Sequence, residues 1–468
     1  MLERKREAVE IVKRLRQHGH QAFLVGGCVR DEVMGRAPKD FDIATSAHPE
    51  DVLRLYPQAL TVGARFGVVL IEAEGHQYEV TTFRSDGTYR DGRRPEEVTY
   101  SEDPRTDVFR RDFTLNGLLC DPLSGEILDF VGGRADIAAG VIRTIGGPEQ
   151  RFREDKLRLL RAVRFAARFG FKIEPATRAA IRQMSAEILQ VSWERSREEL
   201  SKILTEGYAA SGVSLMDECN LLQHLLPEVS ALQGVSQPPE FHPEGDVWTH
   251  TLLMLELMDR AQQGTAALDE RGTVGLNPAL VGDLANAYPT ITLALGVLLH
   301  DIGKPPTFSV SDRIRFNQHA DVGARMATVV CERFRLTNRQ IQRVFELVRD
   351  HLKFKDLPHM RPATAKRFIR QEGFEEHLEL HRLDCLGSHR NLDNWKLAWE
   401  MMSQLDPTEI RPPRVVTGDD LIRLGHSPGP RFQEILKDLE DAQLDGMIRT
   451  REEALAWLKE RYPPDRNP

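Results

Sequence analysis

Three acidic residues near the start of the chain have the types and the spacing that phosphoryl chemistry requires. Asp40 and Asp42 lie in the run KDFDIAT, and on a strand their two carboxylates would point to the same face. Glu79, in the hairpin expected over residues 66–72 and 77–83, is a candidate third carboxylate. Mg²⁺ takes oxygen ligands, and paired metal ions can activate a hydroxyl and stabilise a leaving pyrophosphate. The carboxylates therefore indicate a magnesium-dependent nucleotidyl transfer.

A glycine-rich turn precedes these carboxylates. In the run LVGGCVRD, Gly26 and Gly27 follow an expected strand. Backbone amides can approach phosphate oxygens there because no Cβ intervenes, and Arg30 could add a charged contact to the same phosphates. A lone Gly-Gly is usually a turn and a lone Asp-x-Asp is usually surface charge. Their combination at this spacing favours a nucleotide site.

The run RRDFTLNG at residues 110–117 offers two guanidiniums and a carboxylate just before an expected strand. Arg110 and Arg111 suit triphosphate or ribose contacts. Asp112 could accept hydrogen bonds from ribose hydroxyls, which would select ribonucleotides. The alternative interpretation is an exposed ion cluster.

The run EDKLR at residues 154–158 is expected on a helix, where Glu154, Asp155 and Arg158 would be neighbours at i,i+3 and i,i+4. In isolation such a run is usually a surface ion pair. A carboxylate can nevertheless accept from an exocyclic amine of a base, and a guanidinium can donate to a ring nitrogen or a carbonyl oxygen. Residues 151–182 hold ten basic and three acidic residues. Their arginine stripe suits RNA phosphates, with a solvated helix face as the alternative: Arg158, Arg161, Arg164 and Arg168.

In this order, the motifs resemble the class II tRNA nucleotidyltransferase and bacterial poly(A) polymerase family. The matching runs are GGCVRDEVMG with KDFDIAT, RRDFTLNG, DFVGG with Asp136, and EDKLR followed by LLRAVRFAARFGF, and they cover about residues 20–230. The resemblance implies an α+β fold, with a polymerase-β-like head containing a small mixed sheet, an all-α neck, and a helical body and tail. It also implies that Asp155 and Arg158 bond to the pairing edge of the base and choose CTP, then ATP. The nucleotide-binding candidates are Gly26, Gly27, Arg30, Arg110, Arg111, Asp112, Asn116, Asp155, Arg158, Arg161 and Arg164.

A second constellation begins at His300-Asp301, which follows the apolar run ALGVLL. An adjacent His-Asp pair that ends a buried helix, with further histidines on other helices, indicates a metal centre. The pattern resembles the HD phosphohydrolase superfamily, which implies a divalent transition metal (Ni²⁺, Co²⁺ or Mn²⁺). The implied ligands are His250, His300, Asp301 and Asp384, with His319 and His351 as ligands of a second metal or as phosphate contacts. A degenerate HD fold without catalysis is the alternative.

Composition restricts the classes of partner. The 468 residues carry a net charge of −8, so the protein is not a uniformly basic nucleic-acid coat, and RNA must be held by a local patch. The five cysteines are widely separated, which excludes a zinc ribbon and fits a reducing compartment. The N-terminal run lacks the apolar core of a signal peptide, and the longest apolar run is far below the ~20 residues of a membrane span. We expect a cytoplasmic protein with no DNA or membrane partner.

Changes in pattern along the chain predict four domains: a head (1–150), a helical neck and body (151–235), an HD-type metal domain (236–405) and a helical tail (406–468). The expected breaks are SQPPEFHPEG at 236–245, a stretch near 264–289, and DPTEIRPP at 406–413. The tail runs TGDDL and SPGPRF are similar to the tail of the same tRNA enzymes, which implies a tRNA substrate.

These observations predict an enzyme that adds CCA, or part of it, to tRNA 3′ ends from CTP and ATP, with an added phosphohydrolase activity. Enzymes that add only CC, only A or poly(A) share the same motifs. The long charged loop SDGTYRDGRRPEEV favours full CCA addition, and the run GARFG at 63–67 lacks the extra basic residue expected of poly(A) polymerases. From another class, the rivals are a phosphohydrolase whose head only binds tRNA and a non-catalytic RNA-binding module.

Overall fold

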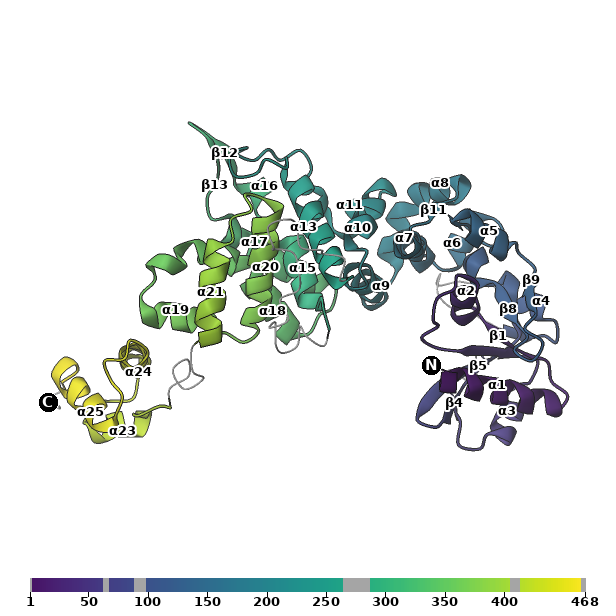
Figure 1. Cartoon of the computed structure of the whole chain (residues 1–468), viewed down its shortest axis with the longest axis horizontal. Helices are drawn as coiled ribbons and strands as arrows, with labels where there is room; N and C mark the ends of the chain where they lie inside the picture. Colours follow the sequence, from purple (N-terminus) through teal and green to yellow (C-terminus); the bar gives the residue numbers. More distant parts are fainter. Residues whose placement is uncertain (1, 62–66, 88–97, 264–286, 405–412, 464–468) are drawn as a thin grey trace. The chain divides into compact units, whose positions relative to one another are not determined.

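A computed structural model describes residues 2–61, 67–87, 98–263, 287–404 and 413–463. The chain divides into two compact units, one of residues 1–230 with 333–335 and one of residues 231–332 with 336–468 (Figure 1). None of the described helices is both long and apolar enough to cross a membrane.

A seven-stranded mixed sheet forms the core of the first 150 residues, in the order β3-β4-β5-β2-β1-β8-β9 (Figure 1). Neighbouring strands are antiparallel except β2 and β5, which run parallel. The strands are β1 (Ala22–Val25), β2 (Asp42–Thr45), β3 (Leu60–Thr61), β4 (Val68–Ala73), β5 (His76–Thr82), β8 (Leu118–Cys120) and β9 (Ile127–Asp129). The predicted hairpin is confirmed as β4 and β5, joined by Glu74 and Gly75, both with positive φ.

Helix α1 (Leu2–Gln17) covers this sheet with the apolar face that its sequence predicts. Ala8, Ile11, Val12 and Leu15 recur at helical spacing and are buried in one core with residues of β1, β2 and β5. Helix α2 (Gly27–Val33) follows β1 directly and packs against β1 and β8. The glycine-rich turn is therefore held at the end of β1, near the start of β2.

The rest of the first unit is largely helical, as predicted. Its main helices are α6 (Pro148–Glu154), α7 (Leu157–Phe169), α8 (Pro175–Met184), α9 (Trp193–Thr205) and α10 (Ala209–Glu218). One detail of the prediction is wrong, because EDKLR does not lie on a single helix. Helix α6 ends at Glu154, Asp155 has an extended backbone (φ −147°, ψ 105°), and α7 begins at Leu157.

The second unit is built around α15 (Ile291–Leu299), an apolar helix buried at every position after Ile291. Helices α13, α18 and α20 pack against it. The unit contains α13 (Val247–Gln262), α16 (Lys304–Thr307), α17 (His319–Arg333), α18 (Asn338–Asp350), α19 (Pro362–Ile369), α20 (Phe374–Gly387) and α21 (Asp393–Gln404). The predicted tail helices are α23 (Gly418–Arg423), α24 (Pro430–Leu444) and α25 (Arg451–Arg461), which share their own apolar core.

Several predicted loops lie outside the described residues. These are most of the charged loop after β6 (Arg84–Asp86), residues 63–66 of the GARFG run, and most of the two breaks near 264–289 and 406–413.

Candidate active site and metal centre

Asp42 and Glu79 lie side by side at the centre of the sheet. Strands β2 and β5 are parallel, with Ile43 opposite Val80, so the preceding residues of the two strands are also neighbours. Burial raises the pKa of Asp42 to about 6, and the negative charge of Glu79 adds to the shift. Such a carboxylate group gains from a bound cation, so the residues present fit a Mg²⁺ ion.

Asp40 completes the carboxylate group from outside the strand. It lies two residues before β2 begins at Asp42, so the expectation that both lie on one strand is wrong for Asp40. Its side chain is 81% exposed, and Arg4 Nη1 lies 3.8 Å from its Oδ1. The carboxylate group therefore consists of one exposed and one half-buried aspartate next to Glu79.

The Gly26 turn lies against an arginine of the RRDFTLNG run. Gly26 has φ 70°, and a Cβ at this position would lie 3.0 Å from Arg111 Nη1. Arg111 Nη2 and Arg110 Nη2 donate to the two oxygens of Asp107, at 2.8 and 2.5 Å. Asp107 is fully buried, so it fixes both guanidiniums, and that of Arg111 lies beside the glycine turn.

Arg30 is buried between the head and α7. Its Nη1 donates to Asn116 Oδ1 at 2.7 Å and its Nε donates to Asp31 Oδ1 at 2.8 Å. Its guanidinium also lies over the rings of Phe165 and Phe169. A phosphate contact by Arg30 stays a prediction, because its Nε and Nη1 already donate to protein groups.

Asp112 accepts hydrogen bonds from two of the predicted nucleotide-binding residues. Asn116 Nδ2 donates to its Oδ1 at 2.9 Å, and Arg161 Nη2 donates to its Oδ2 at 2.6 Å. Burial alone would raise the pKa of Asp112, but Arg161 and Asn116 outweigh it and hold the pKa well below the usual range. The carboxylate is therefore ionised and fixes α7 to the head.

The arginine stripe of α7 is paired with carboxylates. Besides its bond to Asp112, Arg161 has Glu199 Oε1 at 3.5 Å, and Arg164 Nε donates to Glu199 Oε2. Arg168 Nη1 lies 3.8 Å from Glu206 Oε2. These arginines lie between helices of the first unit, so the alternative of a solvated helix face is wrong, and their contact with RNA phosphates stays a prediction.

The two predicted base-selecting residues are held by different partners. Both terminal nitrogens of Arg195 donate to the carboxylate of Asp155, at 3.1 and 2.8 Å. Arg158 donates to Glu154 Oε2 at 2.8 Å and to the carbonyl oxygen of Arg110 at 3.0 Å. The break between α6 and α7 thus places the two side chains apart. Sequence reasoning missed Arg195 and Glu199, because a separation of about 40 residues leaves no local pattern.

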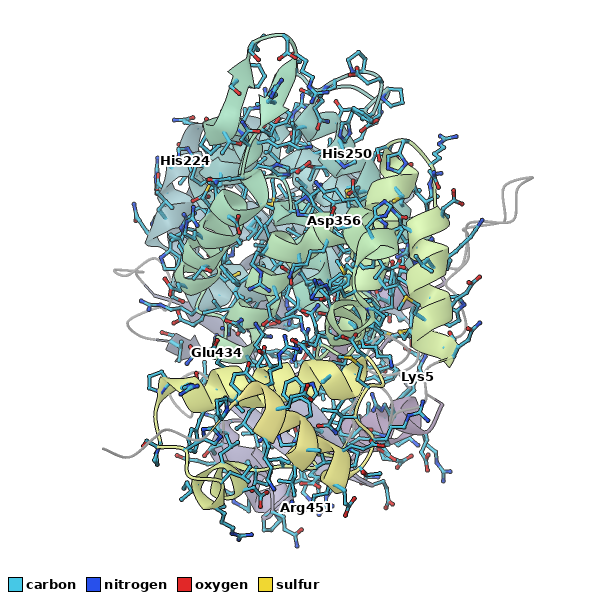
Figure 2. The ribbon with its side chains drawn as sticks, turned by 90° about the vertical axis from the view of Figure 1, so that its left-hand side faces the viewer. Lys5, His224, His250, Asp356, Glu434 and Arg451 are labelled. Carbon is cyan, nitrogen blue, oxygen red and sulfur yellow. The ribbon has the colours of Figure 1, made fainter. Side chains whose placement is uncertain are left out.

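The second unit brings the predicted HD residues together in two groups of possible metal ligands. In each group, one ligand atom per residue lies within 4.8 Å of the others. The first group is His250, His300 and Asp384, with His250 Nε2 at 3.2 Å from Asp384 Oδ1. His250 lies in α13, in the upper part of the unit in Figure 2. The position of Asp384 beside His250 and His300 agrees with its predicted place in the HD-type constellation.

The second group is Asp301, His319 and His351. His319 Nε2 and His351 Nε2 lie 3.5 and 3.9 Å from Asp301 Oδ1. Burial lowers the pKa of His351 to about 3, so its ring is neutral and can act as a ligand. Lys304 Nζ lies 2.6 Å from Asp301 Oδ2 and holds the other side of that carboxylate.

Buried atoms without partners show that these groups fit a metal. Among the described residues, His300 Nε2, His319 Nε2 and Asp301 Oδ1 are buried and make no hydrogen bond of good geometry. Unpaired buried polar atoms are costly, and a cation would satisfy them. The remaining nitrogens are fixed by backbone carbonyls, since the Nδ1 atoms of His300 and His319 contact Val297 O and Phe316 O, each at 2.9 Å.

The predicted break SQPPEFHPEG contributes to this centre. Glu244 Oε1 accepts from His250 Nδ1 at 2.7 Å and lies 2.9 Å from His242 Nδ1. Together these residues form a third possible ligand group. The segment has no helix or strand, as expected, but its role was missed because prolines and a glycine signal a loop and not a site.

Comparisons with known proteins agree with this division of the chain. Three family models match: a "Poly A polymerase head domain" at residues 22–143, a "Probable RNA and SrmB- binding site of polymerase A" at 170–232, and an "HD domain" at 247–384. The HD match begins with α13 and ends at Asp384.

Similar curated proteins are CCA-adding enzymes. The chain is 46% identical to the CCA-adding enzyme of Geobacillus stearothermophilus over 219 residues, which are 47% of this chain and 54% of that protein. It is 37% identical over 249 residues to that of Lactiplantibacillus plantarum, covering 53% of this chain and 61% of that protein. The chain therefore spans about half the length of the curated relatives it matches.

Solved structures match over nearly the whole chain. The Bacillus stearothermophilus CCA-adding enzyme in complex with CTP has a TM-score of 0.68 and 27% identity, covering 97% of both chains. The Thermotoga maritima CCA-adding enzyme complexed with tRNA has a TM-score of 0.55 and 22% identity, covering 97% of this chain and 95% of the other. The second likeness shows the fold alone.

Proposed function

The chain belongs to the family of class II CCA-adding enzymes, and we propose that it adds CCA to tRNA 3′ ends by template-independent nucleotidyl transfer from CTP and ATP. The observation that carries this proposal is the carboxylate group of Asp40, Asp42 and Glu79 beside the Gly26 turn. The raised pKa of Asp42 supports it, since burial and the nearby charge of Glu79 both disfavour the ionised carboxylate in the absence of a cation.

Asp40 and Asp42 would hold Mg²⁺, with Glu79 as a third carboxylate at the same edge. When bound, Mg²⁺ supplies charge neutralisation for the triphosphate and activation of the attacking hydroxyl. The Gly26–Gly27 turn would place backbone amides at the phosphates, and Arg110 and Arg111 would add charge. Because Asp107 orients both arginines, their positions are set before the nucleotide binds.

Base choice is assigned to the break between α6 and α7. Asp155 and Arg158 would bond to the pairing edge of CTP, then of ATP. Arg195 orients the carboxylate of Asp155, and Glu154 orients the guanidinium of Arg158. Each side chain then presents one fixed donor or acceptor set, which is what discrimination between bases requires.

Enzymes that add only CC, only A or poly(A) are the alternative transferases. The two segments that bear on this choice, the charged loop after β6 and the GARFG run, fall largely outside the described residues. Full CCA addition is favoured by the length and charge of that loop in the sequence.

The five cysteines are free and buried, which supports a cytoplasmic location.

A phosphohydrolase activity of the second unit is a second candidate function. Two groups of buried ligands favour it, His250, His300 and Asp384 in one and Asp301, His319 and His351 in the other. A transition metal such as Ni²⁺, Co²⁺ or Mn²⁺ suits their imidazole and carboxylate ligands and would polarise a phosphoryl oxygen. A rival, a hydrolase whose head only binds tRNA, predicts that the head carboxylates are dispensable.

Incubation with defined tRNA ends tests the transferase. The full-length protein is given tRNA that ends at the discriminator base, in CC or in CCA, with labelled CTP and ATP and Mg²⁺. CCA addition to the first, A addition to the second and no addition to the third are expected. Products that stop at CC, that gain only A, or that grow into poly(A) would each identify the corresponding alternative enzyme.

A further inference from the structure

A projecting hairpin in the second unit exposes an apolar face. The hairpin consists of strands β12 (Phe308–Val310) and β13 (Ile314–Phe316) (Figure 1). Phe308 lies opposite Phe316, and Val310 lies opposite Ile314. Since every second residue of a strand points to the same side, these four side chains share one face. Phe308 is 43% exposed and Val310 is 65% exposed.

The base of this hairpin is built into the metal-ligand cluster. Lys304, which lies 2.6 Å from Asp301, is four residues before β12, and His319 is three residues after β13. His319 Nδ1 contacts Phe316 O at 2.9 Å, and the two rings lie 6.2 Å apart. Lys304 Nζ lies 5.4 Å from the centre of the Phe316 ring. The apolar face therefore begins at the cluster itself.

Close packing keeps the two ends of the hairpin together. A Cβ on Gly303 would lie 2.0 Å from the backbone oxygen of His319, so only glycine allows this approach. Phe308 and Phe316 contact each other with their ring centres 5.8 Å apart. The residues that position the possible metal ligands therefore also hold the Phe308–Phe316 pair in place.

We propose that this face stacks the base of a nucleotide whose phosphate lies at the His/Asp cluster. The inference rests on the proposed phosphohydrolase function and names its substrate class: a nucleoside phosphate, or the terminal nucleotide of an RNA. The base of such a molecule is joined to its phosphate through one sugar, so a phosphate beside Asp301 brings the base to Phe316. Every base offers a π-face, which an aromatic side chain binds without regard to sequence.

Charge on the same hairpin favours a phosphate-bearing ligand over a second copy of this acidic chain. Arg313 is exposed at the turn, and Arg315 lies on the opposite face, where it pairs with Asp312 at 2.8 Å. Lys304, at the base, is buried and already paired with Asp301. The hairpin itself holds two arginines and one aspartate, so it combines aromatic rings with a small net positive charge, which suits single-stranded nucleic acid.

Photo-crosslinking tests the contact without relying on catalysis. Full-length protein with Mn²⁺ is irradiated with 5-iodouridine 3′-phosphate, or with a short oligonucleotide that ends in the same nucleotide. We expect the label on the peptide that contains residues 308–316. This label should be lost when Phe308 and Phe316 are both changed to Ala. Labelling by the mononucleotide identifies a free nucleotide as sufficient, and labelling by the oligonucleotide alone identifies an RNA end. Label confined to other peptides overturns the proposal.

A kinetic comparison separates this inference from the hydrolase activity itself. Phe308→Ala should raise KM for a nucleoside 3′-phosphate by about 5- to 100-fold and leave kcat unchanged. It should not change hydrolysis of ribose 5-phosphate, which has no base. Val329→Ala, which truncates a 55% exposed apolar residue on α17, should change neither. An equal effect on both substrates would overturn stacking. If the parent protein forms the cross-link but hydrolyses neither substrate, the proposed phosphohydrolase activity is wrong and the base contact is still supported.

Self-association is the remaining outcome. If sedimentation shows that the parent is a dimer and that the Phe308→Ala, Phe316→Ala variant is a monomer, the face is an interface between copies of the chain and the proposal fails. A variant that keeps the parent's sedimentation and its circular dichroism, but loses the cross-link, supports base binding.

Discussion

Asp155 and Arg158 are three residues apart in the sequence, yet each is held by a different partner on either side of a helix break. Asp155 forms a two-bond pair with Arg195 of α9, and Arg158 bonds to Glu154 and to the backbone of Arg110. The break presents a carboxylate and a guanidinium as separate groups. This arrangement suits recognition of a base edge, because each side chain is oriented by its own partner and the two are not paired with each other.

Removal of either partner at this break should relax base choice. Asp155→Ala should reduce discrimination against UTP and GTP by roughly 1–3 kcal/mol, since one base-edge contact is lost. Arg195→Ala should act in the same direction, because Asp155 then loses the partner that orients it. Misincorporation in single-turnover assays measures both effects.

The matched control for this experiment is Arg153→Ala. Arg153 lies on α6, its side chain is 67% exposed, and it pairs with Glu149. Its removal should leave the fidelity unchanged. Unchanged fidelity in Asp155→Ala would show that this break does not select the base.

Asp42→Ala should abolish nucleotide addition and leave tRNA binding intact. In the proposed reaction the carboxylate beside Glu79 would hold Mg²⁺, whose contribution to the transition state would be worth several kcal/mol, on the order of a thousandfold or more in rate. Incorporation of labelled CTP and a gel-shift assay with tRNA measure the two properties. Glu72→Ala, an exposed acidic residue of β4, is the control and should keep both. Normal addition by Asp42→Ala would place the reaction elsewhere.

His300→Ala combined with Asp301→Ala should remove metal-dependent hydrolysis and spare CCA addition. These residues supply one ligand to each of the two groups of the second unit, whereas the carboxylates of the head belong to the first unit. Hydrolysis of a phosphomonoester or a 2′,3′-cyclic phosphate with added Ni²⁺, Co²⁺ or Mn²⁺ is the readout, together with the stabilisation by Mn²⁺ in a thermal shift assay. His359→Ala, an exposed histidine in the same unit, should keep both properties. Hydrolysis that persists in the double variant would assign the activity to other residues.

The fold, and the presence of a His/Asp cluster in the second unit, could be predicted because they depend on local patterns. The apolar spacing of α1, the Glu74-Gly75 turn and the apolar run of α15 before His300 are all readable within a few residues. Glu199 and Glu244 could not be predicted in the same way. Their roles depend on packing, which brings α9 against α7 and a proline-rich segment against α13. The carboxylates that pair with the arginine stripe could not be predicted for that reason, since they come from segments distant in the sequence.

The Asp107 cluster should make the head sensitive to acid. Burial alone would raise the pKa of Asp107, but Arg111 and Arg110 outweigh burial and lower it. A lowered folded-state pKa means that this contribution to stability is fully present above the unfolded value near 4 and is lost as the pH falls through the folded value. Asp107→Asn should therefore cost about 3 kcal/mol at neutral pH, because two arginines lose their buried partner.

The same substitution should reduce the acid dependence of the head, since Asn does not titrate. Hydrogen exchange of the β1 and β8 amides in the full-length protein, measured between neutral and acid pH, reports the free energy of opening of the head alone. Glu126→Gln, an exposed residue between β8 and β9, should leave this profile unchanged. An Asp107→Asn protein that opens as rarely as the parent at neutral pH, and loses protection in acid as steeply, would show that the cluster does not stabilise the head. In that case Arg111 would be held beside Gly26 by its other contacts.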